Sequence, residues 1–421
     1  MGRPVMSKDR PWRDSKRYLW PLSLVAPAGP FFAWLLAHHV SGLLWGFGAY
    51  LVLVAVPLID VVCGPDRSSP PDGAVRALAA DRYYRWCTYL FVPVQYAGFV
   101  FGAWCLANEP MTTGERGGLA ITMGISAAVG INAAHELGHK NTRSEKSFAK
   151  LALAPSFYGH FFVEHNVGHH VRVATPADPA SARLGESLWV FYPRALVGGF
   201  LSGVRSQAGR LRRQGHGFWH PSNDILQSWT ISVVLFAAVI GAFGWEVAPW
   251  LALQAVIGML VLEAVNYIEH YGLLRAREPD GRLGRVRPEH SWNGDHPGSN
   301  VLLLNLQRHS DHHAHGSRRY QALRSCKEAP QLPAGYALMV LTALVTPLWR
   351  VLMDPRVVAH YDGDVTRANL QPSKAAKLIH RYSPGVHRDG TVHHPALRPD
   401  GPDENLTRGK AERRLDSADS A

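Results

Sequence analysis

Cysteine is scarce in this chain, and its placement excludes several kinds of site. The 421 residues contain only four cysteines, Cys63, Cys87, Cys105 and Cys326, which lie far apart in the sequence. Because there is no Cys-x-x-Cys pair, we expect neither a disulfide framework nor a thiolate site for iron or zinc. A recognised nucleic-acid-binding module is also missing, so we expect no nucleic-acid partner. We therefore assign the formal net charge of +11 to cytoplasmic flanks and to a face for anionic lipid or an acidic protein.

Long apolar runs are hidden by a mean hydropathy of only −0.09. A helix needs about 20 apolar residues to cross a bilayer, and six runs are long enough: roughly 18–38, 42–62, 86–107, 118–134, 225–243 and 247–268. A seventh run, 332–352, is broken by Pro333 and Pro347, and we interpret it as an interfacial or docked helix. The first run is too long, and begins too late, to be a cleaved signal peptide.

Lysine and arginine orient these runs. Residues 1–17 carry six lysines and arginines, whereas the connection after the first run has none. Positive residues mark the cytoplasmic side, and six crossings return the chain to the side where it started. We therefore expect a multi-pass protein of the inner (cytoplasmic) membrane with both termini cytoplasmic. Its expected parts are a cytoplasmic segment 1–17, a membrane-embedded domain 18–388 and a disordered tail 389–421.

Nine of the 22 histidines stand in four clusters at or beyond the predicted cytoplasmic helix ends. Histidines three or four residues apart share one helix face, and ionisable groups at membrane depth are seldom idle. Since zinc takes about four ligands and octahedral iron six, nine imidazoles favour two ions sharing one site. The predicted ligands are His135, His139, His165, His169, His170, His270, His309, His312 and His313.

Each cluster has an acidic neighbour, namely Glu136, Glu164, Glu269 or Asp311. Ligating imidazoles commonly donate their second N–H to a carboxylate, so we expect these acids to orient the histidines. The metal stays open, because imidazole suits zinc, copper, iron and nickel.

Two competing functions use the same histidines. The segment His135-Glu136-Leu-Gly-His139 matches the pattern of zinc proteases, in which the glutamate is the general base. A protease would leave six or more histidines unused. A non-catalytic transporter or sensor would need histidines strung along the spans, whereas these gather at one membrane depth.

Taken together, the four clusters resemble the membrane-bound alkane 1-monooxygenases (AlkB-type alkane omega-hydroxylases), relatives of the integral-membrane fatty-acid desaturases and hydroxylases. The resemblance covers about residues 18–354, and its most specific motifs are Asn266-Tyr-Ile-Glu-His270-Tyr-Gly and Leu306-Gln-Arg-His-Ser-Asp-His-His-Ala-His315. It implies an all-α integral membrane protein with six transmembrane helices and a cytoplasmic histidine-rich di-iron cap. The nine clustered histidines would hold two non-haem irons, and Asn266 would hold a water near one of them.

The resemblance also implies a reaction. One atom of dioxygen would enter a terminal methyl C–H bond of a medium-to-long-chain n-alkane and give the 1-alcohol, with electrons from NADH passing through a reductase and rubredoxin. The rubredoxin must be a separate chain, because no Cys-x-x-Cys pair is present, and we expect no haem and no directly bound flavin or nicotinamide. Acyl desaturation, methylarene hydroxylation and epoxidation are the alternatives within the superfamily.

Two further sets of residues carry predictions about partner docking and substrate access. Rubredoxins are small and acidic, so cytoplasmic cations near the clusters are docking candidates: Lys140, Arg143, Arg308, Arg318 and Arg319. The fourth apolar run is rich in small residues, which either allow close helix packing or line an apolar channel toward His135. The channel candidates are Val52, Gly124 and Ala127.

Overall fold

The computed structural model of the chain describes residues 12–383. Within this range every regular element is a helix, and the only β pairing consists of three isolated bridges. The all-α prediction is therefore confirmed. Residues 1–11 of the predicted cytoplasmic segment and the whole predicted tail, 389–421, lie outside the described residues.

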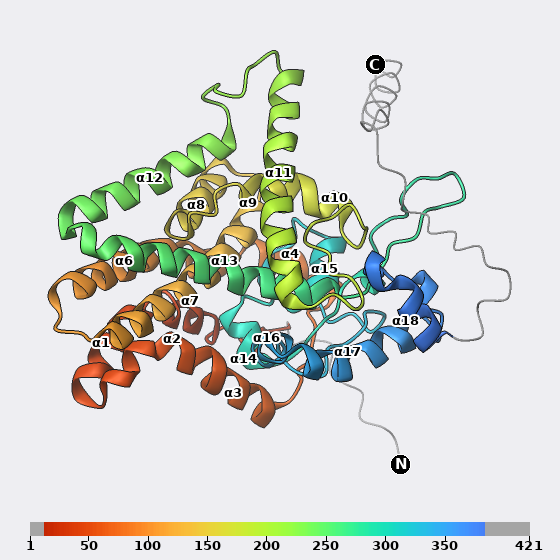
Figure 1. Cartoon of the computed structure of the whole chain (residues 1–421), viewed down its shortest axis with the longest axis horizontal. Helices are drawn as coiled ribbons and strands as arrows, with labels where there is room; N and C mark the ends of the chain where they lie inside the picture. The colour runs from red at the N-terminus through yellow and green to blue at the C-terminus, as the bar shows by residue number, and fades with distance from the viewer. Residues whose placement is uncertain (1–11, 384–421) are drawn as a thin grey trace. The chain divides into compact units, whose positions relative to one another are not determined.

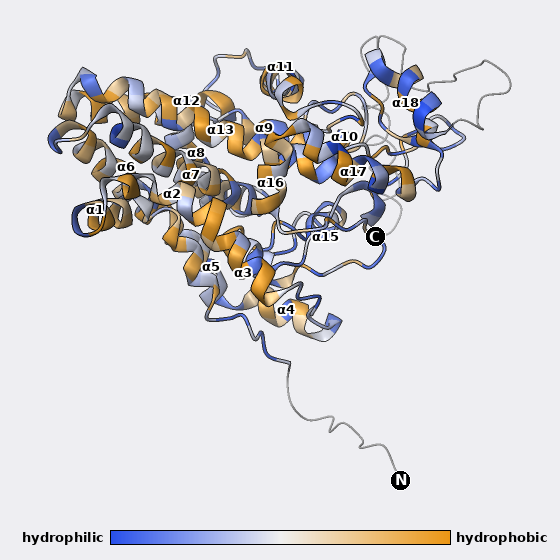
Figure 2. Ribbon diagram, turned by 60° about the horizontal axis from the view of Figure 1, so that its bottom comes forward, coloured by the Kyte–Doolittle hydropathy of each residue, from blue (hydrophilic) through white to orange (hydrophobic). Residues whose placement is uncertain are grey.

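Five helical segments are long and apolar enough to cross a membrane, and they match the second to sixth predicted runs. In Figure 1 they extend toward the left, and Figure 2 colours many of their residues as hydrophobic. They contain α2 (Phe47–Tyr50) with α3 (Val56–Cys63), α5 (Arg82–Tyr89) with α6 (Phe91–Asn108), α7 (Thr113–Gly138), α12 (Asp224–Phe243) and α13 (Ala248–His270). The segments themselves are Gly42–Cys63, Arg82–Asn108, Thr113–Gly138, Asp224–Phe243 and Trp245–His270.

The first predicted run differs from a single long helix. It forms a 3₁₀ helix, Trp20–Val25, followed by the 11-residue helix α1, Gly29–His39. Pro27 and Pro30 lie at the break, and proline both lacks a backbone N–H and disfavours helical geometry in the preceding residue. Helix α1 packs against α6 and α7.

The seventh predicted run is not a span. It forms α16 (Tyr336–Leu344) and α17 (Thr346–His360), which are separated at Val345 just before Pro347. Helix α16 packs against α13, which agrees with a docked helix.

Small residues let α7 and α13 pack closely. A Cβ atom added to Gly124 would lie 2.6 Å from Ile257 Cγ2 of α13, and one added to Gly258 would lie 2.9 Å from Ala127 Cβ. Neither site has room for even a methyl group. Gly124 and Ala127 therefore lie in the α7–α13 packing interface, which supports the packing interpretation, whereas the channel toward His135 stays a prediction.

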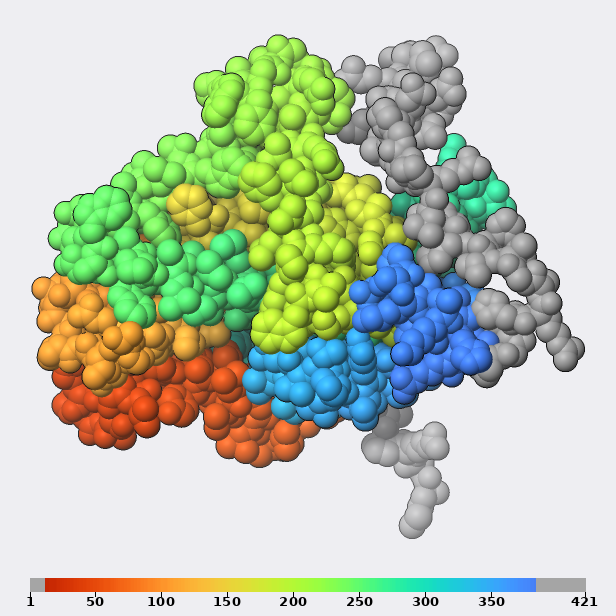
Figure 3. Space-filling model, viewed as in Figure 1, coloured from red at the N-terminus to blue at the C-terminus, as the bar shows by residue number. Residues whose placement is uncertain are grey.

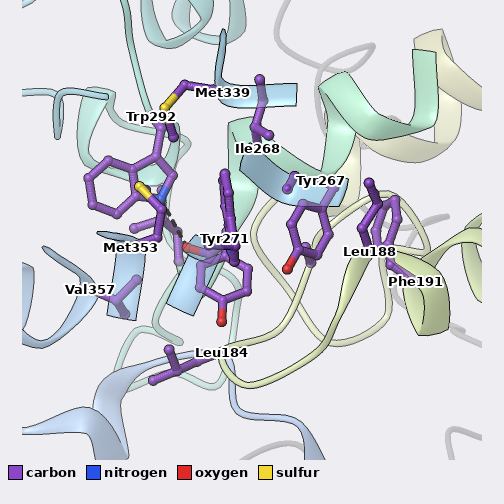
Figure 4. Close-up of a cluster of buried hydrophobic side chains, with 14 of the residues drawn as sticks. Leu184, Leu188, Phe191, Tyr267, Ile268, Tyr271, Trp292, Met339, Met353 and Val357 are labelled. Atoms are coloured by element: carbon purple, nitrogen blue, oxygen red, sulfur yellow. Dashed lines mark hydrogen bonds between the residues drawn. The ribbon is translucent and has the colours of Figure 1, made fainter. Parts of the chain in front are cut away.

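A large buried hydrophobic cluster holds the C-terminal end of α13. Figure 4 shows side chains from α11 (Leu188–Arg213), α13, α16 and α17 in one cluster with Trp292, including Tyr267 and Met353. The Trp292 indole donates to the backbone oxygen of Tyr271 at 2.9 Å, and the Trp292 N–H donates to the backbone oxygen of Glu269 at 2.8 Å. This packing fixes the last turn of α13, which ends at His270.

The remaining helices complete the fold outside the five candidate spans. Helix α11 lies beside the α16–α17 junction, where the Trp189 indole donates to the Leu344 backbone oxygen at 3.1 Å, and Figure 3 shows α11 and α17 as neighbours on one face. The other helices are α4 (Asp72–Ala80), α8 (Arg143–Leu153), α9 (Phe161–Val163), α10 (His170–Arg172), α11 (Leu188–Arg213), α14 (Pro297–Leu302), α15 (His309–Ala314) and α18 (Ala375–Tyr382).

Candidate metal centre

The structure brings all nine predicted histidines into two groups. Within each group, one nitrogen from every histidine lies within 4.8 Å of the corresponding nitrogens of the others. The first group is His135, His139, His165, His170 and His312, and the second is His169, His270, His309 and His313.

Each group draws on segments that lie far apart in the sequence. His135 lies in the last turn of α7, and His139 caps that helix. The pair shares a group, as the spacing of four residues predicts. His165 and His169 have the same spacing but enter different groups, because residues Glu164–His169 form a π-helical turn that changes their angular relation.

The nitrogens of each group face one another at short range. In the first group, His135 Nε2 lies 2.8 Å from His312 Nε2, which is 3.1 Å from His170 Nε2. In the second, His309 Nε2 lies 2.8 Å from His313 Nε2 and 3.2 Å from His270 Nε2. Such convergence suits a shared cation.

Two imidazole rings of the second group have hydrogen-bond partners at the nitrogen that faces away from the group, and these partners show whether a metal ion fits the site. His270 Nδ1 lies 3.2 Å from the backbone oxygen of His290, and His169 Nδ1 lies 2.9 Å from Asp178 Oδ2. Both partners can only accept, so the proton of each neutral ring is on Nδ1 and a lone pair on Nε2 points into the second group. His139 Nε2, in the first group, is buried without a hydrogen-bond partner in the described structure. Donor lone pairs aimed at one point fit a bound metal ion.

Burial keeps most of these rings neutral. It lowers the pKa of His139, His165 and His170 well below the usual value, and does the same for all three histidines of α15. A neutral imidazole is the form that ligates a metal.

His169 is the exception, and Asp178 is the reason. Burial lowers the pKa of His169, but the Asp178 carboxylate outweighs burial and gives a net rise. Burial also raises the pKa of Asp178, but the interaction with His169 outweighs the effect of burial. The net result is that the pKa of Asp178 falls to about 2. The pair therefore favours positive charge at His169, and a metal ion at Nε2 supplies such charge in place of a proton.

Asp178 was missed by the sequence analysis. It lies nine residues after His169 in a loop, and its side chain also accepts from Ser181 Oγ at 2.6 Å. No helical spacing links it to the histidines, so periodicity could not have found it.

Of the four predicted orienting acids, Glu269 lies against a clustered histidine. Its Oε2 is 3.2 Å from His309 Nε2, and its Oε1 is buried without a hydrogen-bond partner in the described structure. The other three carboxylates are engaged elsewhere: Glu136 with Lys140 and Tyr320, Glu164 with Arg172 and Ser202, and Asp311 with His315, Arg318 and Arg324. They brace the segments that carry the histidines.

A small polar cavity adjoins the first group. Its lining includes His165, Glu164, Glu263 and Asn266. The Asn266 amide donates to Glu263 Oε2 at 3.3 Å, and Tyr158 donates to Glu263 Oε1 at 2.6 Å. Burial raises the pKa of Glu164 to about 7. Asn266 therefore lines the same cavity as His165, and its role in holding a water near one metal ion stays a prediction.

Two of the five predicted docking cations are buried, which corrects that prediction. Lys140 is 4% exposed and its Nζ lies 3.0 Å from Glu136 Oε1. Arg308 is 1% exposed and donates to the backbone oxygens of Leu323 and Ser68. Neither side chain is available to another protein.

The other three cations lie at or near an open cleft. The cleft has a volume of about 440 Å³ and is lined in part by Arg318 and Arg319, while Arg143 is exposed nearby on α8. Gly316 lies between the cleft and the first histidine group, since a Cβ atom added there would be 3.6 Å from His139 Nδ1. The first histidine group is therefore close to the molecular surface at this cleft.

The fold and the site together define an all-helical membrane protein with a buried, histidine-lined metal centre. Comparison with known proteins agrees with this class: residues 116–343 match the family model described as fatty acid desaturase. The chain is 42% identical to alkane 1-monooxygenase of Ectopseudomonas oleovorans over 88% of its own length and 92% of the relative. It is 44% identical to alkane 1-monooxygenase 1 of Alcanivorax borkumensis over 85% and 89%.

This chain belongs to the alkane 1-monooxygenase family. A more distant relative is the xylene/toluene monooxygenase hydroxylase component of Pseudomonas putida, which is 28% identical over 73% of this chain and 82% of the relative.

Proposed function

We propose that this enzyme hydroxylates medium-to-long-chain n-alkanes at the terminal carbon, using dioxygen and electrons from reduced rubredoxin. Two irons would be bound by the nine histidines, five in the first group and four in the second. The observation that carries the proposal is the pair of adjoining, buried imidazole-only groups in a chain of this family.

The chemistry fits the donors. An unactivated C–H bond offers no site for acid–base or nucleophilic attack, so the reaction needs a redox metal. When bound, iron supplies the redox chemistry that activates dioxygen. The protein would fix the tautomers of His169 and His270 through Asp178 and the His290 backbone oxygen, and would exclude water from the rings by burial.

Metal analysis and product analysis test this proposal together. The purified enzyme should contain about two irons per chain, the number that nine imidazoles favour, and with rubredoxin, reductase and NADH it should convert an n-alkane to the 1-alcohol. A single zinc with peptide hydrolysis that is lost in Glu136→Gln would instead establish the protease. Glu136 already pairs with Lys140 at 3.0 Å, which opposes a role as general base.

Methylarene hydroxylation is a second candidate, favoured by the xylene/toluene monooxygenase relative. Product analysis with n-alkanes, toluene, alkenes and acyl lipids separates the candidates. Terminal alcohols from alkanes at the highest rate support the first proposal, whereas preferential conversion of toluene supports the second.

The substrate would reach the centre beside Val52. This residue is half-buried against a cluster that includes Val129 and Ala133, which lie on α7 shortly before His135. The valine side chain is small and packs against this cluster. The apolar route is therefore proposed along the cluster, toward the residues of α7 that precede His135.

Rubredoxin is proposed to dock over the cleft beside Gly316, with Arg143, Arg318 and Arg319 at its rim. Charge reversal at Arg143 should slow reduction of the iron by rubredoxin at low salt and leave reduction by dithionite unchanged. Lys16→Glu is a matched control, because Lys16 pairs with Asp66 outside the cleft lining. Equal rates for wild type and Arg143→Glu would refute this docking site.

Six crossings are proposed for domain 18–388, with both termini cytoplasmic in the inner membrane. The broken segment Trp20–His39 would span about 30 Å, given about 2.0 Å per residue in its 3₁₀ part and about 1.5 Å in α1. Exposed Cys63 would then be cytoplasmic and Val40 external. A membrane-impermeant thiol reagent should label Val40→Cys in intact spheroplasts and leave Cys63 unlabelled, and the reverse pattern would contradict this orientation.

A further inference from the structure

A line of aromatic side chains runs from the interior near the first histidine group to the surface. The ring centroids of Tyr320 and Tyr84 are 6.3 Å apart, those of Tyr84 and Tyr83 are 5.5 Å apart, and those of Tyr83 and Tyr18 are 6.3 Å apart. Trp20 adjoins Tyr320 at 5.1 Å. Tyr320 is 2% exposed and Tyr18 is 81% exposed, so the line connects a dry interior to solvent. Three separate segments of the chain build it.

The inner end of the line is linked to the metal centre. The backbone N–H of Tyr320 donates to Glu136 Oε1 at 3.3 Å. Glu136 directly follows His135 on α7, so one hydrogen bond and a short covalent path join Tyr320 to the first histidine group. The Trp20, Tyr84 and Tyr320 rings share one buried cluster, which gives the line fixed spacings.

The middle of the line has a base within hydrogen-bond distance. Asp14 Oδ2 accepts from the Tyr84 hydroxyl at 2.9 Å and from the Trp20 indole N–H at 2.9 Å. Tyr320 instead donates to the backbone oxygen of Tyr84 at 3.1 Å, and a carbonyl oxygen is a poor proton acceptor. A phenol that loses an electron becomes strongly acidic, so the oxidised state is best held where a carboxylate can take the proton. That place is Tyr84.

We propose that this line is an oxidation route that protects the metal centre when dioxygen is activated without alkane. One electron would leave Tyr84, pass through Tyr320 to the oxidant formed from dioxygen at the centre, and reduce that oxidant by one electron. The Tyr84 phenolic proton moves to Asp14, which leaves a neutral tyrosyl radical. A soluble thiol reaching the exposed end at Tyr18 would return one electron through Tyr83, becoming a thiyl radical and releasing its own proton to solvent. The phenolic proton of Tyr84 would return from Asp14. This inference rests on the proposed monooxygenase function.

The direction of transfer follows from the side chains. Tyrosine and tryptophan give up an electron only to a strong oxidant, and they do not accept one from a mild biological reductant. The line therefore does not carry the electrons that drive hydroxylation. Arg17 lies over the Tyr83 and Tyr84 rings at 4.3 and 5.2 Å. Its positive charge disfavours a cationic ring and so favours the deprotonated, neutral radical.

The test uses the iron-loaded, chemically reduced full-length enzyme mixed with dioxygen. Freeze-quench electron paramagnetic resonance should show a tyrosyl radical without alkane and a much smaller signal with saturating alkane. The signal should be lost in Tyr84→Phe and in Asp14→Asn. It should persist in the control Tyr96→Phe, whose hydroxyl bonds to the Leu151 backbone oxygen away from the line.

A second readout separates a redox role from simple packing. During incubation with dioxygen and reductant but no alkane, Tyr84→Phe should accumulate oxidised histidine near the centre, detected by mass spectrometry, faster than wild type. Its initial rate of alcohol formation with alkane should equal that of wild type, although loss of the hydrogen bond to Asp14 should lower its melting temperature.

The outcomes are distinguishable from failure of the proposed function. If wild type forms alcohol but no radical, or if Tyr84→Phe keeps the same signal, the oxidation route is refuted and the monooxygenase function stands. If wild type forms no alcohol from any hydrocarbon, the proposed function fails and this inference fails with it.

Discussion

Replacement of Asp178 by asparagine tests the electrostatic logic of the second histidine group. Asp178 is completely buried and places Oδ2 2.9 Å from His169 Nδ1. In the wild type, Asp178 Oδ1 accepts a hydrogen bond from the backbone N–H of Ala180 at 3.2 Å, and an asparagine oxygen can keep this bond. The NH₂ group of the asparagine then faces His169 Nδ1, which must accept, so the ring proton moves to Nε2. The lone pair aimed at the other histidines is lost.

The size of the effect follows from this geometry. Groups that orient a metal ligand typically contribute about 10–100-fold to metal affinity or activity, which corresponds to about 1.4–2.7 kcal/mol. No water can replace the carboxylate, because neither Asp178 nor His169 is appreciably exposed. We therefore expect Asp178→Asn to reach the upper part of this range.

The assay is chelator competition for iron, followed by iron content per chain and alcohol formation. Asp364→Asn is a matched control, since Asp364 caps a 3₁₀ turn through the Thr366 N–H outside both histidine groups. The reasoning is refuted if Asp178→Asn binds iron as tightly as wild type. A melting curve of the metal-free variant shows whether loss of folding explains the result.

Three further predictions concern packing, substrate length and metal. Gly258→Val should lower the free energy of unfolding by about 1–3 kcal/mol, measured by thermal unfolding in detergent. The control Gly241→Val should not lower it, because a Cβ atom at Gly241 meets nothing within 4 Å. Equal melting temperatures for the two variants would contradict the close packing. Val52→Trp should shift product formation toward shorter alkanes, and the exposed control Val54→Trp should not. An unchanged chain-length profile removes Val52 from the route. Removal of the metal by a chelator should lower the melting temperature, and ferrous iron should restore it. The stabilisation by bound iron should be about 2.7 kcal/mol when free iron is at a hundredfold excess over its Kd. His309→Ala should reduce this stabilisation, and an unchanged value would exclude His309 as a ligand.

The membrane architecture could be read largely from the sequence. Five predicted runs reappear as candidate spans because hydrophobic length is a local property of the chain. The first run shows the limit of that reading. Pro27 and Pro30 are visible in the sequence, but only the fold decides whether they kink a helix or end it, and here helix α1 begins at Gly29.

The docking cations show a different limit. Arg308 has the composition of a surface residue, yet it is buried because loops from distant segments offer it backbone oxygens. Charge is a property of the residue, whereas exposure depends on what folds around it. For the same reason, the sequence could not show which helix the small residues Gly124 and Ala127 pack against, and the structure shows that it is α13.

The sequence alone determined which nine imidazoles come to the centre, because ionisable side chains at the ends of apolar helices are costly unless they are used. Tertiary structure decided how they divide into five and four, through the π-helical turn at Glu164–His169 and the meeting of four remote segments. It also decided that Asp178 orients His169. The residue type and the local spacing identify the ligands. The grouping of the histidines and the tautomer of each ring depend on angles and contacts that exist only once distant segments pack together.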